Sequence, residues 1–114
     1  MSSAGDMAER LAQRHLEDAG LKPVARNFRC RMGEIDLIMQ DGGYLVFVEV
    51  RLRKHREFGG AAASIDRQKQ QRIVKAAQHY LATLARTPPC RFDVVLLDAL
   101  EDAHIDWIRS AFDA

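Results

Sequence analysis

Cysteine is scarce in this chain, and its two residues of this type, Cys30 and Cys90, stand far apart in the sequence. Neither belongs to a Cys-x-x-Cys pair, and the four histidines are scattered, so the sequence argues against a zinc site. We therefore expect two reduced thiols in a cytoplasmic protein.

Long apolar runs are also missing. No segment approaches the ~20 apolar residues of a membrane-spanning helix, and the N-terminal residues lack the apolar core of a signal peptide. Internal repeats, low-complexity tracts and linkers are absent from the 114 residues as well. The composition therefore predicts one domain, residues 1–114, that has its own core and no membrane partner.

The net charge of +1 conceals an uneven distribution, because residues 1–92 carry +6 and residues 93–114 carry −5. Such clustering of positive charge favours a polyanionic partner, and nucleic acid above all. A solvated basic surface is the alternative, and an acidic C-terminal segment that contacts a basic protein is another. The basic residues form three groups: Arg26, Arg29 and Arg31; Arg51, Arg53, Lys54 and Arg56; and Arg67, Lys69, Arg72 and Lys75.

Hydrophobic periodicity and turn residues predict an α/β fold with the order α-β-β-β-α-β. The second helix is long enough to connect two parallel strands, which gives a mixed central sheet flanked by helices. The expected helices cover residues 6–19 and about 64–85, and the expected strands cover 24–30, 33–38, 46–51 and 91–97, with 104–108 as an optional short edge strand.

The strands at 33–38 and 46–51 carry acidic side chains in apolar surroundings. Glu49 interrupts a run that is otherwise apolar on both faces, as in a central strand covered from both sides. A carboxylate in such a strand is unfavourable unless a cation or hydrogen-bond donors compensate its charge. Ordinary packing gives no reason for Glu49, whereas a metal-dependent site does.

The turn between these strands leaves two registers open. A loop at residues 42–43 places Asp36 across from Glu49. The same loop places Glu34 across from Arg51. A loop one residue earlier makes Glu34 face Glu49 instead. Either register is expected to bring all four side chains to one face of the sheet.

Acidic groups this close repel one another, and a divalent cation would reverse that penalty. Hard oxygen ligands suit Mg²⁺ or Mn²⁺. The alternative is a hairpin with one solvated, charged face. Glu9, in the first helix, has two open roles: a capping box with Asp6, which spacing alone favours, or a further acid near the metal.

These motifs resemble the PD-(D/E)xK nuclease motif, in which an acid on one strand precedes Glu-x-Lys on the next. The closer likeness is to the YraN-like bacterial family, and it covers nearly the whole chain. The blocks that carry it are Ala8-Glu9, Arg26-Asn27-Phe28-Arg29, Gly33-Glu34-Ile35-Asp36-Leu37-Ile38, Val46-Phe47-Val48-Glu49-Val50-Arg51, Lys69 and Arg91-Phe92-Asp93-Val94-Val95.

This resemblance implies a restriction-endonuclease-like fold, similar to archaeal Holliday-junction resolvases. It also implies a Mg²⁺- or Mn²⁺-dependent DNA endonuclease that acts on branched or damaged DNA. Asp36, Glu49 and Glu9 would hold the metal, and Glu34 and Lys69 match further positions of the family. Symmetric cutting of two strands would favour a C2 homodimer.

Arg51 departs from the motif, which has lysine at this position. Lysine can release a proton when buried, whereas arginine stays charged, so we expect Arg51 to clamp a phosphate. Water activation would then fall to the metal or to Lys69, which could equally be a helix-edge lysine. The departure also supports an alternative function, a nucleic-acid-binding module without turnover. Further phosphate contacts are expected from Arg53, Lys54 and Arg56.

Overall fold

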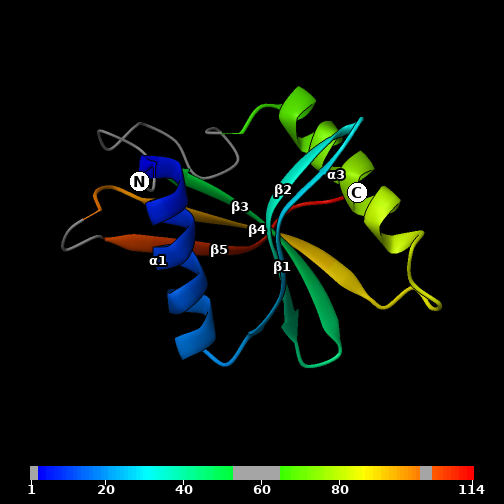
Figure 1. Cartoon of the computed structure of the whole chain (residues 1–114), viewed down its shortest axis with the longest axis horizontal. Coiled ribbons are helices and arrows are strands. Elements are labelled where there is room, and N and C mark those ends of the chain that lie inside the picture. Colours follow the sequence, from blue (N-terminus) through cyan, green and yellow to red (C-terminus); the bar gives the residue numbers. More distant parts are fainter. Residues whose placement is uncertain (1–2, 53–64, 101–103) are drawn as a thin grey trace.

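The computed structural model describes residues 3–52, 65–100 and 104–114, and its elements are coloured along the chain in Figure 1. The order is the predicted one, extended by the optional last strand. The elements are α1 (Ala4–Asp18), β1 (Lys22–Cys30), β2 (Gly33–Asp41), β3 (Tyr44–Leu52), α3 (Arg67–Leu81), β4 (Cys90–Leu97) and β5 (Ile105–Phe112).

The strands of the described residues form a mixed five-stranded sheet in the order β1-β2-β3-β4-β5. Neighbours pair antiparallel except β3 and β4, which are parallel and are connected through α3. The predicted α/β fold with a mixed sheet is therefore confirmed. Neither described helix is long and apolar enough to cross a membrane.

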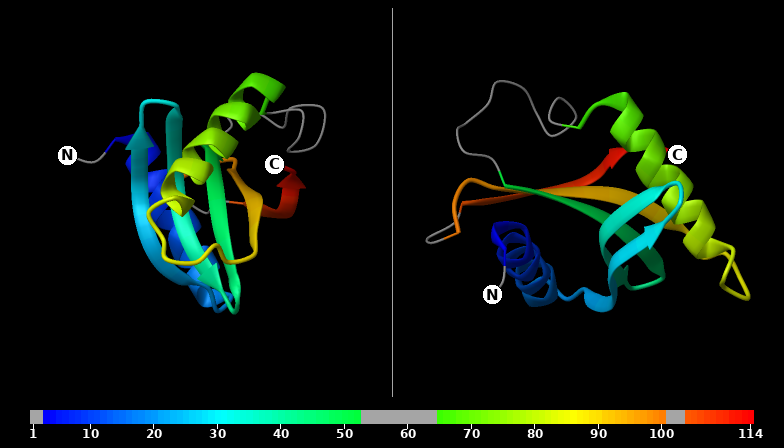
Figure 2. Two further views of the ribbon diagram at one scale, coloured as in Figure 1. Left: turned by 90° about the vertical axis from the view of Figure 1, so that its right-hand side faces the viewer. Right: turned by 45° about the horizontal axis from the view of Figure 1, so that its top comes forward.

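The two helices cover opposite sides of the sheet (Figure 2). Alternation along β3 separates the two cores, because Val46 and Val48 face α1 whereas Leu45 and Phe47 face α3. Both sides of the central strands are consequently buried, as the apolar run around Glu49 predicted. The α1 side also contains Ala8, Ala12, Leu16, Leu37, Met39, Val95 and Leu97, and the α3 side contains Ile35, Ile38, Ile73, Ala76, Ala77 and Phe92.

Helix α1 begins earlier than the sequence suggested. Its N-cap is Ser3, whose hydroxyl accepts a hydrogen bond from the Asp6 backbone N–H at 3.1 Å. The expected capping box between Asp6 and Glu9 is therefore wrong, because Asp6 already lies in the first turn. Glu9 is therefore not part of a capping box.

Helix α3 is shorter than expected at its C-terminal end. Asp66 caps its start by accepting from the Lys69 backbone N–H at 2.7 Å, as the predicted start near residues 64–66 requires. The helix ends at Leu81, where the Thr83 hydroxyl donates to the Tyr80 carbonyl at 2.6 Å and competes with the helical bonds. Leu84, which lies within the expected helix at about 64–85, is consequently outside the observed helix and exposed.

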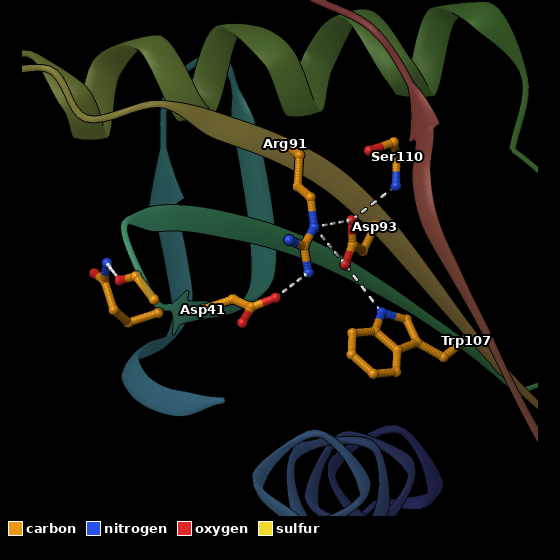
Figure 3. A network of polar contacts seen from close by, with 7 residues as sticks. Asp41, Arg91, Asp93, Trp107 and Ser110 are labelled. Atoms are coloured by element: carbon orange, nitrogen blue, oxygen red, sulfur yellow. Dashed lines mark hydrogen bonds and ion pairs between the residues drawn. The ribbon is translucent and has the colours of Figure 1, made fainter. Parts of the chain in front are cut away.

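Strand β5 is longer than the optional edge strand of the prediction, and a buried carboxylate holds it to the sheet (Figure 3). Asp93 is 0% exposed and accepts hydrogen bonds from Arg91 Nε at 3.1 Å, Trp107 Nε1 at 2.9 Å and the Ser110 backbone N–H at 3.0 Å. Arg91 Nη2 also donates to Asp41 at 2.8 Å. Ser110 reaches Asp93 because its φ of 49° and the irregular register at this point bend β5 inward.

Replacement of Asp93 by alanine should lower the free energy of unfolding by about 3–5 kcal/mol, since Arg91 would lose a buried ionic partner. Urea denaturation measures the change. The control is Asp18→Ala, an exposed position at the end of α1, which should change stability by less than about 0.5 kcal/mol. Equal stabilities of the two variants would contradict the assigned role of the Asp93 network.

Candidate functional site

Two carboxyl groups meet where β2 and β3 stop pairing. The ladder between these strands runs from Asp41 opposite Tyr44 to Leu37 opposite Val48, which confirms the register with the loop at residues 42–43. Asp36 and Glu49 follow directly on this ladder, and their side chains share a hydrogen bond. The sequence therefore placed this pair correctly.

The carboxylate of Asp36 replaces the backbone acceptor of the next hydrogen bond in the ladder. Its Oδ2 accepts from the Val50 backbone N–H at 2.9 Å, and beyond this point β1 and β2 turn away from β3 towards α3 (Figure 1). Ile35 and Ile38 both pack on the α3 side, so strict alternation in β2 is broken between them. This irregularity lets Asp36 bond to the β3 backbone and still contact Glu49.

The expected pairing of Glu34 with Arg51 is wrong, because the described β2–β3 ladder ends before it reaches Glu34. Glu34 instead pairs across β1 with Arg29, and its Oε2 lies 3.3 Å from Arg29 Nε. Glu34 is half exposed and affects Asp36 through its charge. It is therefore a neighbour of the carboxyl pair rather than a member of it.

Burial makes the carboxyl pair hold protons tightly. Glu49 is 6% exposed, and this burial, together with the negative charge of Asp36, raises its pKa to about 8. Burial also raises the pKa of Asp36, against the hydrogen bonds from Val50 and Glu49 and the charge of Lys69, which favour the ionised form. At neutral pH the pair thus shares a proton that a cation could displace.

Two cationic side chains approach this pair from the α3 side. Lys69 Nζ lies 4.0 Å from Glu49 Oε1, and the charges of Lys69 and Arg51 both lower the pKa of Glu49. Arg51 and Lys69 also line one small cavity of about 160 Å³. The structure thus brings Asp36, Glu49, Arg51 and Lys69 together.

Glu9 approaches from α1, on the other side of the sheet. Its carboxyl group bonds to the Asn27 side chain, and Oε1 lies 4.0 Å from Arg26 Nη2. Burial and the charge of Asp36 raise its pKa, and Oε1 is buried without a hydrogen-bond partner. A buried acceptor in this condition is unfavourable, and a water molecule or a cation between Glu9 and Asp36 would satisfy it.

Asn27 was not predicted as a site residue. It stands in β1 between the Arg26–Leu37 and Phe28–Ile35 pairs and has a φ of 52°, in the left-handed region that asparagine tolerates. This kink turns Arg26 towards Glu9 while Phe28 packs on the α3 side. Two signals were present in the sequence: an asparagine inside a strand, where this residue is uncommon, and its place in the Arg26-Asn27-Phe28-Arg29 block.

The residues present fit a magnesium-type ion. Within residues 3–52, 65–100 and 104–114 no three His, Cys, Asp or Glu side chains are grouped as metal ligands. Mg²⁺, however, usually takes one or two carboxylates and completes its shell with water and substrate phosphate. Asp36 and Glu49 would supply these carboxylates, with Glu9 acting through water.

The predicted phosphate contacts Arg53, Lys54 and Arg56 lie outside the described residues. Their role therefore remains a prediction from the sequence. Arg51, the one predicted phosphate contact within the described residues, lies in β3 and is exposed.

The residues of the candidate site lie inside a region that matches a protein family. Residues 8–97 match the model of the "Uncharacterised protein family UPF0102". A UPF0102 protein of Cupriavidus taiwanensis is 61% identical over 111 residues, which cover 96% of this chain and 82% of that protein. A UPF0102 protein of Methylobacillus flagellatus is 51% identical over 114 residues, the full length of both chains. One of Nitrosospira multiformis is 56% identical over 96% of this chain and 92% of its own length.

In the absence of divalent cations, the free energy of unfolding should fall as the pH rises from about 4.5 to about 8. The folded protein keeps a proton on Glu49 that the unfolded chain releases above its ordinary pKa. The stabilising contribution of this proton is therefore complete below the pKa of Glu49 in the unfolded chain. It is lost as the pH rises through the pKa of Glu49 in the folded protein. Urea denaturation in EDTA at several pH values measures this trend.

Glu49→Gln should abolish most of that dependence on pH, because the amide cannot ionise. Glu17→Gln, at an exposed position of α1, is the matched control and should retain it. The same slope in the Glu49→Gln variant as in the unmodified protein would refute the assignment of the proton to the carboxyl pair.

Proposed function

This chain belongs to the uncharacterised protein family UPF0102, and we propose that it is a Mg²⁺- or Mn²⁺-dependent endonuclease that hydrolyses phosphodiester bonds of DNA. We also propose that the fold is a restriction-endonuclease-like core of the PD-(D/E)xK type, similar to that of Holliday-junction resolvases. Branched or damaged DNA is the proposed substrate class, and a C2 dimer is the assembly that symmetric cutting would require.

One observation carries the proposal. Glu49 is buried and Asp36 is partly buried beside it, and the two carboxyl groups share a hydrogen bond and have raised pKa values. Two carboxyl groups that repel in a low-dielectric place lower the stability of the fold, and such an arrangement is typical of a functional site. The approach of Lys69 to within 4.0 Å of Glu49 adds a cation at the edge of the same site.

Each residue has a chemical role in this mechanism. Asp36 and Glu49 would hold the cation, which when bound supplies charge stabilisation for the phosphate and activation of water. Arg51 holds a phosphate oxygen and stabilises the negative charge that develops on it. Lys69 is close enough to Glu49 to keep this carboxylate oriented. Glu9 adds negative charge from the α1 side and interacts electrostatically with Asp36.

The decisive experiment combines metal binding with cleavage. Calorimetry should detect Mg²⁺ or Mn²⁺ binding to the unmodified protein and its loss in Asp36→Asn. Labelled linear, flapped and four-way DNA should be cut with either cation by the unmodified protein, and at least about 100-fold more slowly by Asp36→Asn. Glu17→Gln is the control. Metal binding without cleavage of any of these DNAs would favour the nucleic-acid-binding module instead.

Arg51 provides a test of its own. Arg51→Ala should weaken DNA affinity and slow cleavage about tenfold or more, since one charged phosphate contact is lost. Arg51→Lys should keep affinity roughly unchanged and increase turnover, because lysine can release a proton. Fluorescence anisotropy and cleavage rates measure the two effects. Binding and cleavage by Arg51→Ala at the rates of the unmodified protein would exclude the phosphate clamp.

A further inference from the structure

Helix α3 presents positive charge on both sides of its exposed surface. Its sequence contains two lysines, two arginines and no acidic residue. The residues divide between two grooves along the helix. Lys69 and Arg72 line the cavities that face β3 and the β1–β2 hairpin, whereas Arg67 and Lys75 line a larger groove next to the C-terminal residues.

Two of these cavities are neighbours of the carboxyl pair. One, of about 160 Å³, contains Arg51, and the other, of about 300 Å³, contains Arg29. Lys69 and Arg72, one turn apart on α3, line both of them. Because Lys69 also lies 4.0 Å from Glu49, both cavities adjoin the carboxyl pair through this lysine.

The second cavity has a rigid wall. Gly33, at the end of the β1–β2 hairpin, lies so close to α3 that an added Cβ would be 2.8 Å from the Arg72 carbonyl oxygen. The hairpin is therefore seated directly on the helix backbone, and Arg29 and Arg72 are held on opposite walls of one cavity. Arg29 is 74% exposed and is oriented by its contact with Glu34.

We propose that Arg72 and Arg29 form a phosphate-binding site of their own, which holds the nucleic-acid backbone adjacent to the phosphate at Arg51. The ligand is the phosphodiester backbone of a DNA strand that runs from the Arg51 cavity past Lys69 into the Arg29 cavity. The inference rests on the proposed function for the position of the reacting phosphate. Two guanidinium groups on facing walls suit phosphate oxygens, and such contacts orient a strand without reading its sequence.

The larger groove on the other side of α3 is the competing path. It has a volume of about 880 Å³ and contains Arg67 and Lys75, but it also contains Asp113 and the C-terminal Ala114. Neither Lys69 nor Arg51 lines it. A strand in this groove would lie on the side of α3 that contacts neither Arg51 nor the Lys69–Glu49 pair, so we assign the strand to the first path.

The test measures binding of a short fluorescein-labelled DNA duplex by anisotropy in EDTA, so that neither metal binding nor cleavage enters the result. Arg72→Gln should weaken affinity about tenfold and reduce the salt slope by about 0.9 for the lost phosphate contact. The double variant Arg29→Gln/Glu34→Gln removes one charge of each sign and should weaken binding similarly. Arg67→Gln/Lys75→Gln is the matched control and should bind within about twofold of the unmodified protein.

Two results would overturn the inference: unchanged affinity of Arg72→Gln, or an equal loss in Arg67→Gln/Lys75→Gln, which would indicate general attraction to a basic helix. Circular dichroism establishes that each variant is folded. DNA binding that depends on Arg72, together with no cleavage in Mg²⁺, would refute the nuclease and support the phosphate site. Metal-dependent cleavage that Arg72→Gln leaves unchanged would refute only the phosphate site.

Discussion

The proximity of a buried and a partly buried carboxyl group is the constraint on which the architecture around this site depends. Asp36 and Glu49 could lie far apart at little cost if the hairpin paired regularly to its end. Instead, the Asp36 carboxylate replaces a backbone acceptor for Val50, and the strands diverge where this exchange occurs. In this fold, burial and mutual repulsion oppose the ionisation of both groups, and one backbone donor and Lys69 offset this in part.

A second consequence of this exchange is that one point of the sheet can be reached from both of its faces. The left-handed backbone at Asn27 and the broken alternation at Asp36 lie side by side in β1 and β2. Glu9 therefore acts on Asp36 from the α1 side, whereas Lys69 contacts Glu49 from the α3 side. In a regular sheet the strands would separate these two helices completely.

The sequence predicted the parts of this structure that depend on local pattern. The order of elements and the closeness of Asp36 and Glu49 follow from periodicity and turn chemistry, whereas the choice between the two registers that the turn left open came from the structure. The partner of Glu34 could not be predicted, because it depends on where the β2–β3 ladder stops. Periodicity likewise assumes regular strands, so it could not reveal the kink at Asn27. The length of β5 depends on Asp93, a contact between residues far apart in the sequence.

The Asp93 network also bears on where this domain can be divided. The family match ends at Leu97, yet the donors from Trp107 and Ser110 that stabilise Asp93 come from β5, beyond that boundary. A chain shortened to the matched region would keep every carboxylate of the candidate site but would leave Asp93 with fewer donors and expose the β4 edge. The unit that satisfies Asp93 therefore includes β5 and is larger than the region matched by the family model, because an ionic group of the matched region needs partners outside it.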